Sequence, residues 1–211
     1  MRFPATGVTG AWQGGPMRTF ELTDGVVLLR APGAADVDRI AALCQDPAIQ
    51  EWTTVPSPYA RADAESYVTG MVADGWANGT QLNWAVRDAA GGTLVGMVGL
   101  GMEGAGSAEL GYWLAPEARG RGVMARAVDL VLDAAFGRLE LARVFWRAFV
   151  GNGPSRAVAE RAGFRVEGEL RLGGVQRGVR RDEWVGSLLA TDDRPRRVGE
   201  RPAAGAAARE G

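Results

Sequence analysis

The stretch Glu109–Phe136, ELGYWLAPEARGRGVMARAVDLVLDAAF, decides the fold. Its first six residues, up to Leu114, are rich in apolar and aromatic side chains and predict a β-strand that ends before Pro116. Beyond Gly122 the apolar residues recur at three- and four-residue spacing, which predicts a helix. A turn that also contains Gly120 separates the two elements. The stretch therefore predicts a strand, a glycine-containing turn and the start of a helix.

The start of such a helix is suited to an anion. The first turn has free backbone N–H groups and the positive end of the helix dipole. Gly120 and Gly122 let a phosphate approach the backbone without a Cβ in its way. Arg119, Arg121 and Arg126 add positive charge. Together these residues predict a pyrophosphate cradle.

Three known phosphate loops can be compared with this turn. The Walker loop requires a lysine, and the chain has none. The dinucleotide fingerprint GxGxx(G/A) fits Gly120-Arg-Gly-Val-Met-Ala125, but it needs an acidic residue at the end of the next strand. Glu140 has about the right spacing and lies before that strand, which we expect at residues 143–150. The third loop, (Q/R)xxGx(G/A), fits Arg119-Gly-Arg-Gly-Val-Met124 except at its last position.

The composition excludes several kinds of catalysis. There is no histidine, which excludes Ser-His-Asp catalysis and His-ligated zinc. The absence of lysine excludes Schiff-base chemistry. A titrating catalyst must then be Asp, Glu, Tyr, the single cysteine Cys44 or a relayed water. Cys44 lies on the apolar stripe of an expected helix over residues 35–45, which favours a buried structural thiol.

Length and charge indicate one compact domain. A chain of 211 residues with 46% hydrophobic content can form a core without disulfides. A net charge of −1 predicts no general attraction to nucleic acid or to an acidic membrane. No apolar run approaches the ~20 residues of a membrane span, no signal-peptide pattern is seen, and one cysteine fits a reducing compartment, so we expect a cytoplasmic protein. We expect a flexible extension at 1–23, a folded domain at 24–190 and a disordered tail at 191–211.

The remaining patterns predict an α+β protein. A strand–helix–strand unit implies one parallel crossover, whereas the strands before it form an antiparallel meander. We expect loops at Pro47–Tyr59 and at Gly173–Arg181, the latter a flexible basic hairpin. The expected strands lie near residues 26–30, 83–88, 93–101, 107–114, 143–150, 164–170 and 183–190, and the other expected helices lie near 60–76 and 155–162.

With its surroundings, the third loop resembles the GNAT superfamily of acyl-CoA N-acyltransferases. Asn152-Gly-Pro-Ser155, followed by Arg161-Ala-Gly-Phe-Arg-Val-Glu-Gly168, is similar to the RimJ/RimL branch, the ribosomal-protein N-terminal acetyltransferases. Leu28-Leu-Arg-Ala-Pro32 and Arg181-Asp-Glu-Trp184 are similar to that branch too. The resemblance covers residues 26–190. It implies a GNAT fold with a mostly antiparallel twisted sheet of six to seven strands, one splayed parallel pair and about four flanking helices.

The resemblance also implies an activity. A GNAT enzyme of this kind is an N-acetyltransferase that moves an acetyl group from acetyl-CoA to a primary amine by direct attack in a ternary complex. The acceptor is a protein N-terminus or a small molecule, no metal is needed, and the protein is a monomer or homodimer. Two alternatives stay open: an acyl-CoA-binding sensor or scaffold of the same fold, and a dinucleotide-dependent oxidoreductase.

The resemblance implies roles for particular residues. Asn152 binds the pantetheine arm of CoA, and Ser155 serves the departing thiolate, although capping of the next helix is an alternative for both. A backbone N–H near Leu114 serves the thioester oxygen. The residues implied for CoA binding are Trp113, Leu114, Arg119, Gly120, Arg121, Gly122, Val123, Met124, Ala125 and Asn152.

The general base is the most open assignment. Glu109 is the first candidate because it lies on the strand that leads to the cradle, and an exposed carboxylate paired with an arginine is the alternative. Some RimL-like proteins have a catalytic glutamate seven residues beyond the position of Glu167, where this chain has Gly174. Glu169, Asp182 and solvent are further candidates for the base. Trp52 and Tyr59 are expected to line the acceptor site, and for Trp52 the alternative is to cover the edge of the core.

Overall fold

A computed structural model describes residues 17–88 and 92–195, which form one sheet flanked by helices. The strand order is β1-β2-β3-β4-β5-β6-β8-β7. Within these residues every neighbouring pair is antiparallel except β5–β6, which is parallel. The strands are β1 (Leu22–Thr23), β2 (Val27–Arg30), β3 (Gln81–Asp88), β4 (Gly96–Gly104), β5 (Ser107–Leu114), β6 (Arg143–Phe149), β7 (Arg165–Gln176) and β8 (Val179–Leu189). The predicted α+β class with one parallel pair is confirmed, and the short edge strand β1 brings the number of strands to eight.

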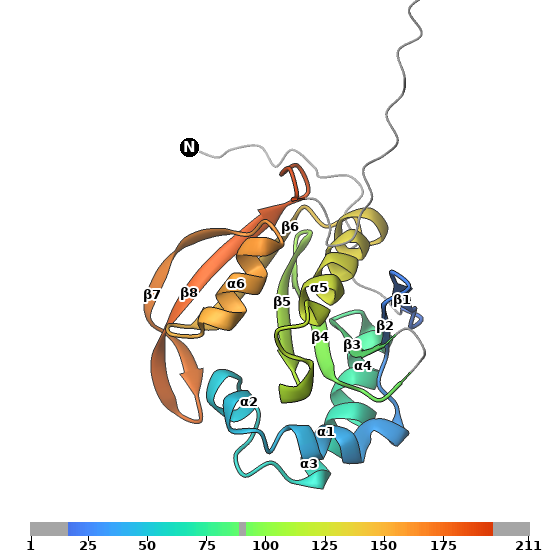
Figure 1. The fold of residues 1–211 in the computed structure, drawn as a ribbon. Coiled ribbons are helices and arrows are strands. Elements are labelled where there is room, and N and C mark those ends of the chain that lie inside the picture. The colour runs from blue at the N-terminus through green and yellow to red at the C-terminus, as the bar shows by residue number, and fades with distance from the viewer. Residues whose placement is uncertain (1–16, 89–91, 196–211) are drawn as a thin grey trace, which may run out of the picture.

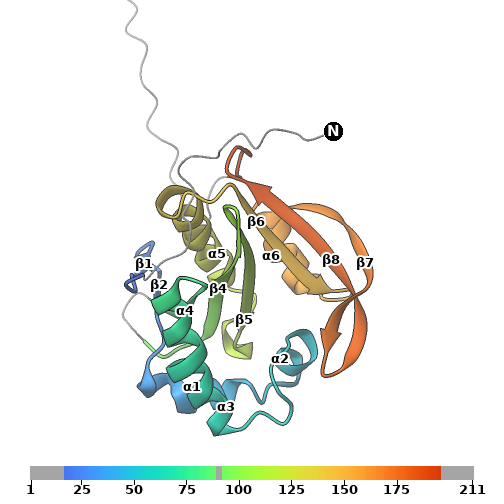
Figure 2. The ribbon, with the colours of Figure 1, turned by 180° about the vertical axis from the view of Figure 1, so that it is seen from behind.

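Helices cover both faces of this sheet. Figures 1 and 2 show α5 and α6 on one face and α4 on the other. The α-helices are α1 (Val37–Leu43), α2 (Pro47–Trp52), α3 (Arg61–Ser66), α4 (Ala73–Asn78), α5 (Val123–Asp133) and α6 (Gly153–Arg161). Two 3₁₀ turns, η1 (Ala34–Asp36) and η3 (Pro116–Ala118), precede α1 and α5, and two π-helical turns are η2 (Tyr67–Val72) and η4 (Ala134–Arg138). The helix expected at 60–76 is therefore α3, η2 and α4 in succession.

The prediction of a loop at Pro47–Tyr59 was wrong in its first half, which forms α2. Asp46 caps this helix, since its side chain accepts a hydrogen bond from the Ile49 N–H at 2.9 Å. Pro47 then occupies the first helical turn, where its missing N–H costs nothing. The helix ends at Trp52, so this indole is carried by a helix end.

The hydrophobic core extends into a segment that was expected to be flexible. Phe20 lies in edge-to-face contact with Trp76 and Trp84, with ring centroids 5.3 and 5.5 Å apart. Beyond the last strand, Arg194 forms ion pairs with Asp129 and Asp133 of α5. Residues 17–23 and 191–195 are thus packed on the domain, contrary to the expected boundaries. The rest of the expected extension and tail lies outside the described residues.

The β7–β8 hairpin differs from the expected flexible link at Gly173–Arg181. The two strands pair almost to their ends, and the turn is reduced to Arg177 and Gly178, which have φ of 47° and 80°. Arg177 and Arg181 donate hydrogen bonds to backbone carbonyls at the C-terminal end of α2. Cations are favoured there because that end of a helix carries partial negative charge. The arginines therefore attach the hairpin to α2.

The parallel pair β5–β6 is hydrogen-bonded over only part of its length. Its register runs from Ser107 opposite Arg143 to Leu110 opposite Trp146 and ends there. Beyond that point β5 stays paired with β4 and β6 stays paired with β8. The two halves of the sheet diverge, as Figure 2 shows, with α2 near the open end. This confirms the predicted splay and creates an opening in the sheet.

Candidate active site

A cavity of about 780 Å³ lies at the opening between β5 and β6. Its walls come from β3, β4, β5, β6, the β7–β8 hairpin, α1, the segment from α2 to η2 and the start of α6. Of the residues singled out in the sequence, those lining the cavity are Cys44, Trp52, Tyr59, Glu109, Trp113, Asn152, Ser155 and Gly174. Its charged residues are Asp63, Glu109, Arg147 and Glu183. Candidate residues from distant parts of the chain therefore line one cavity.

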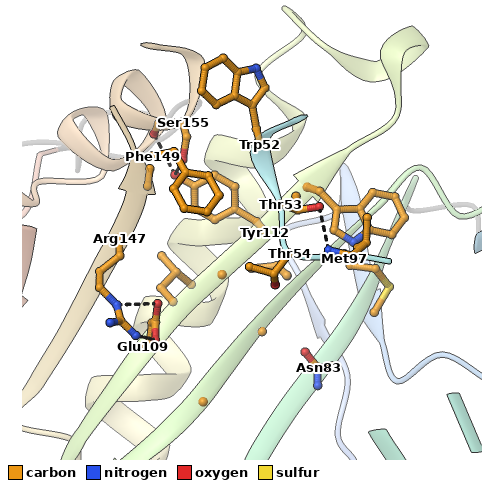
Figure 3. Close-up of a pocket in the computed structure, with 18 of the residues that line it drawn as sticks. Trp52, Thr53, Thr54, Asn83, Met97, Glu109, Tyr112, Arg147, Phe149 and Ser155 are labelled. Carbon is orange, nitrogen blue, oxygen red and sulfur yellow. Dashed lines mark hydrogen bonds and ion pairs between the residues drawn. The ribbon is translucent and has the colours of Figure 1, made fainter. Parts of the chain in front are cut away.

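Glu109 is paired with an arginine of the neighbouring strand. Arg147 on β6 donates from Nε to Oε1 of Glu109 at 3.1 Å and from Nη2 to Oε2 at 2.7 Å. Figure 3 shows the two side chains facing each other across the parallel pair. Such a bidentate pair occupies both carboxylate oxygens. The alternative of a carboxylate paired with an arginine thus describes the geometry of Glu109.

Ser155 lies in a hydroxyl network that links α6 to β5 and β6. Its Oγ accepts a hydrogen bond from the indole Nε1 of Trp146 at 3.0 Å and lies 3.2 Å from the phenol oxygen of Tyr112. The Tyr112 hydroxyl in turn donates to the Ser155 carbonyl at 2.8 Å. Burial raises the pKa of Tyr112, so its phenol stays protonated near neutral pH. The network holds two hydroxyl groups beside the cavity (Figure 3).

Asn152 caps α6. Its side-chain Oδ1 accepts a hydrogen bond from the Ser155 N–H at 3.1 Å. Pro154 in the first turn is also favoured at a helix start. The capping alternative from the sequence is therefore present, and the same cap fixes the backbone that carries the Ser155 hydroxyl.

Glu183 on β8 is a carboxylate that the sequence reasoning missed. Its Oε2 is buried and has no hydrogen-bond partner among the described residues. Burial raises the pKa of Glu183, Arg147 opposes that rise and Glu109 adds to it. A Cβ built at Gly174 would lie 2.3 Å from its Oε1, so glycine at that position leaves room for the carboxylate. An ionisable group without a fixed partner thus lies at the cavity.

The aromatic residues predicted for the acceptor side have different surroundings. Trp52 at the end of α2 faces the cavity, and the Arg181 guanidinium lies 5.2 Å from its ring centroid. Tyr59 is largely buried in a second hydrophobic cluster. Cys44 lies in that cluster as well, where burial raises its thiol pKa to about 11, which confirms the predicted buried thiol. Trp52 is therefore the more accessible of the two aromatic residues.

The predicted cradle lies outside this cavity, at the start of α5. Gly120 and Gly122 have φ of 73° and 74°, a region in which a side chain is strained, and an added Cβ at either would meet no atom within 4 Å. Gly122 is the N-cap of α5, and space is open beside both glycines. The turn therefore has the backbone shape and the clearance that a phosphate group requires.

The arginines of the cradle are not equivalent. Arg119 pairs with Asp46 at 2.6 Å, and Arg126 pairs with Asp24 at 2.7 Å. Arg121 is exposed and has no carboxylate within 4.0 Å in the part of the chain that the structure describes. Of the residues predicted for cofactor contact, Met124 and Ala125 bury their side chains, so only their backbone N–H groups are available. Leu114 and Val123 are half-buried and do not line the cavity.

Tyr112, Arg147 and Glu183 line the cavity but were not among the site residues proposed from the sequence. Tyr112 lies inside the stretch that decides the fold, and its position next to Trp113 could have identified it as a site residue. Arg147 gave no local sign, and Glu183 lies within the quoted stretch Arg181–Trp184 without being singled out, because the proximity of the two depends on the pairing of β6 with β8. Neither Glu169 nor Asp182 lines the cavity, and the Asp182 side chain accepts a hydrogen bond from the Leu172 N–H at 2.6 Å.

The described residues set two further limits. No helix among them is long and apolar enough to cross a membrane. Within the same residues there is no group of three or more His, Cys, Asp or Glu side chains that could hold a metal ion. The sheet, with its single described parallel pair, is also not the doubly wound parallel sheet on which a dinucleotide fingerprint relies.

Comparisons with known proteins agree with this geometry. Residues 27–165 match the family model "Acetyltransferase (GNAT) domain". The putative ribosomal N-acetyltransferase YdaF of Bacillus subtilis is 46% identical over 82 residues, which are 39% of this chain and 45% of YdaF. The probable N-acetyltransferase YjcK of the same organism is 39% identical over 87 residues, 41% of this chain and 48% of YjcK. The chain therefore spans about half the length of the curated relatives it matches.

A solved structure shows the same fold over more of the chain. Mycobacterium smegmatis RimJ in complex with CoA-disulfide has a TM-score of 0.73 and 27% sequence identity. The match covers 84% of this chain and 90% of RimJ. The likeness thus includes both halves of the splayed sheet.

Proposed function

The chain belongs to the GNAT acetyltransferase family, and we propose on that premise that it is an N-acetyltransferase that moves the acetyl group of acetyl-CoA to a primary amine. One observation carries the proposal. The opening between β5 and β6 contains a cavity whose lining includes both carboxylates and the hydroxyl network of Ser155. Acyl transfer to an amine needs both a proton acceptor and a donor to the leaving group.

The fit of acetyl-CoA is supported by the start of α5. Gly120 and Gly122 keep the backbone clear of side chains, and Arg121 adds a positive charge that no carboxylate of the described residues pairs with. The free N–H groups of Val123, Met124 and Ala125 would hold the pyrophosphate. Asn152, beside the opening, would bind the pantetheine arm. Acetyl-CoA supplies an activated acetyl thioester when it is bound.

The acceptor side of the cavity favours a cation. Its charged residues are three carboxylates and one guanidinium, and the guanidinium is neutralised by Glu109. The remaining carboxylates, Asp63 and Glu183, attract an ammonium group. Trp52 adds an aromatic face, which also favours cations. A primary amine is charged in water near neutral pH, so this environment suits it.

The backbone of β5 supports a donor for the thioester oxygen. The Ala115 N–H donates to the Val95 carbonyl on the β4 side, at 2.7 Å. Successive N–H groups along a strand point to opposite sides, so we expect the Leu114 N–H to point toward β6. β6 has diverged at that point and offers no partner strand. A free N–H beside developing negative charge stabilises the transition state.

Ser155 is proposed to serve the departing thiolate. Its Oγ accepts from the Trp146 indole and donates to the Tyr112 oxygen, so the Ser155 hydroxyl carries a proton that can turn to the sulfur. YdaF is named as a ribosomal N-acetyltransferase, which makes a protein N-terminal α-amine one class of acceptor for this chain. A small-molecule amine is the other class.

Calorimetry with acetyl-CoA, CoA and NADH tests the proposal first. We expect saturable binding of both CoA species, and loss of that binding in Gly122→Glu, because an anionic side chain would repel the pyrophosphate. Gly122→Ala is the matched control, since it shares the positive-φ strain of about 1–2 kcal/mol without the charge. Tighter binding of NADH than of acetyl-CoA would instead support the oxidoreductase alternative.

Acetyl transfer is then measured by mass spectrometry on peptides with free N-termini and on small primary amines. Product that carries one added acetyl group, with release of one CoA, is the expected result. Acetyl-CoA binding without transfer to any amine would support the sensor or scaffold alternative.

A further inference from the structure

The three carboxylates of the cavity differ in their hydrogen-bond partners. Both oxygens of Glu109 accept from Arg147. Asp63, in the first turn of α3, accepts from the N–H of the N-cap residue Ala60 at 2.7 Å. Glu183 has a buried Oε2 without a partner among the described residues. A buried carboxylate oxygen left unpaired costs free energy, so Glu183 is the group that gains most from a proton or a donor brought by a ligand.

We propose that Glu183 is the catalytic base of the acetyl transfer, the carboxylate that takes the proton from the acceptor ammonium. This inference rests on the proposed function. Glu183 projects from β8 opposite Phe149, at the place where β6 diverges from β5. It lines the same cavity as Tyr112 and Ser155. The base and the proposed proton donor to sulfur are thus on the walls of one space.

The residues around Glu183 leave room for its carboxylate and set its charge environment. Gly174 on β7 has no side chain, and a Cβ there would lie 2.5 Å from the carboxylate carbon of Glu183 and 2.7 Å from the Phe149 ring. Any larger residue at 174 would displace the carboxylate or the ring. Glu109 and Arg147 are the charged groups that act on Glu183 from β5 and β6. Burial raises the pKa of Glu183, and the opposite effects of Arg147 and Glu109 leave it raised, which suits proton uptake from an amine.

The acetyl transfer moves two protons from nitrogen and exchanges the C–S bond for an N–C bond. The acceptor ammonium gives one proton to the Glu183 carboxylate, which later releases it to solvent. The freed lone pair on nitrogen forms the N–C bond to the acetyl carbon, and the C–S bond breaks. The second proton leaves nitrogen for water as the amide forms, and the sulfur leaving group receives one proton from water or from the hydroxyl network, which water then reprotonates. The sum is one amide, one thiol and one proton released.

The test is Glu183→Gln, which keeps the shape and removes the base. We expect kcat to fall about 10²-fold or more at neutral pH, with the calorimetric Kd for acetyl-CoA unchanged within about twofold. The acid limb of the pH–rate profile should disappear, and activity should recover partly at high pH, where solvent deprotonates the amine. Glu160→Gln, an exposed glutamate on α6, is the matched control and should retain the wild-type rate.

The outcomes separate this inference from the proposed function. If wild-type protein transfers no acetyl group to any amine, the proposed function fails. If the wild type is active and Glu183→Gln keeps its rate within threefold, or keeps the same acid limb, Glu183 is not the base. A readout without acetyl-CoA is the ¹³C NMR titration of glutamate carboxyls. The resonance lost in Glu183→Gln should titrate above the ordinary glutamate range, and titration at or below that range would overturn the proposal.

Discussion

Glu109 and Arg147 form a bidentate ion pair across the only two parallel strands in the described part of the sheet, with the shorter contact at 2.7 Å. The pair lies where the hydrogen bonding of β5 to β6 ends. Its charges act on Glu183 with opposite sign, since Arg147 lowers the pKa of Glu183 and Glu109 raises it. The ion pair therefore sets the electrostatic environment of the third charged group.

Replacing Glu109 and replacing Arg147 should shift the acid limb of the pH–rate profile in opposite directions. In Glu109→Gln one negative charge is lost and Arg147 is freed, so the pKa of Glu183 falls and the limb moves to lower pH. In Arg147→Gln the pKa of Glu183 rises and the limb moves to higher pH. The measurement is kcat/KM against pH for both variants and the wild type. A shift of the same sign in both would show that another group titrates.

Ser155→Ala should reduce both activity and stability. It removes the acceptor of the Trp146 indole N–H, which is buried, and a buried donor left unpaired costs about 1–3 kcal/mol. Loss of the proposed proton donor should lower kcat by on the order of 10²-fold. Urea unfolding and steady-state kinetics measure the two effects.

Tyr112→Phe should be coupled to Ser155→Ala, because the two hydroxyls contact each other. Alone it removes the hydrogen bond to the Ser155 carbonyl and should cost about 1 kcal/mol of unfolding free energy. In a double-mutant cycle, the sum of the losses in unfolding free energy of the two single variants should exceed the loss in the double variant by about 0.5 kcal/mol or more. Strict additivity would contradict a shared network.

Asp36→Ala should be strongly destabilising. Asp36 and Arg87 form a buried ion pair, with residues only 8% and 6% exposed. Removing the aspartate leaves the guanidinium charge buried and unpaired, which costs about 3–5 kcal/mol. Asp38→Ala is the control, since Asp38 pairs with Arg61 at the surface and exposed pairs contribute about 0–1 kcal/mol. Equal losses of unfolding free energy in the two variants would contradict a larger contribution from the buried pair.

Gln176→Ala should loosen the attachment of α2 to the β7–β8 hairpin. The Gln176 side chain donates from Nε2 to the backbone carbonyls of Gln50, Glu51 and Thr53, at 2.6–3.1 Å. Its loss should lower the local opening free energy of α2 by about 1–3 kcal/mol and speed amide exchange there by on the order of 10- to 100-fold. KM for the acceptor should rise, since Trp52 is carried by the end of α2.

Arg180→Ala is the comparison for this variant. It lies on the same hairpin and donates to the Leu172 carbonyl, within the hairpin itself. Hydrogen–deuterium exchange of α2 should stay at the wild-type rate in Arg180→Ala. Unchanged exchange in Gln176→Ala as well would mean that Arg177 and Arg181 hold α2 without it.

Local features of the sequence were enough for the strand–turn–helix unit and for the caps. Gly122 at the N-cap of α5 and Asn152 at the N-cap of α6 follow from residues within a few positions along the chain. The splay of the parallel pair was implied by the resemblance. In contrast, α2 was missed because three prolines suggested a loop, while the Asp46 cap and Pro47 together start a helix.

By itself, the sequence determined the α+β class, the glycine turn before α5, the buried Cys44 and the exclusion of histidine and lysine chemistry, because these depend on composition or on neighbours along the chain. Only the tertiary structure decided which carboxylate is free. Glu109 is occupied by Arg147 from the adjacent strand, whereas Glu183 meets the cavity through the pairing of β8 with β6. Contacts between strands depend on register and on the twist of the whole sheet, and no local pattern encodes them.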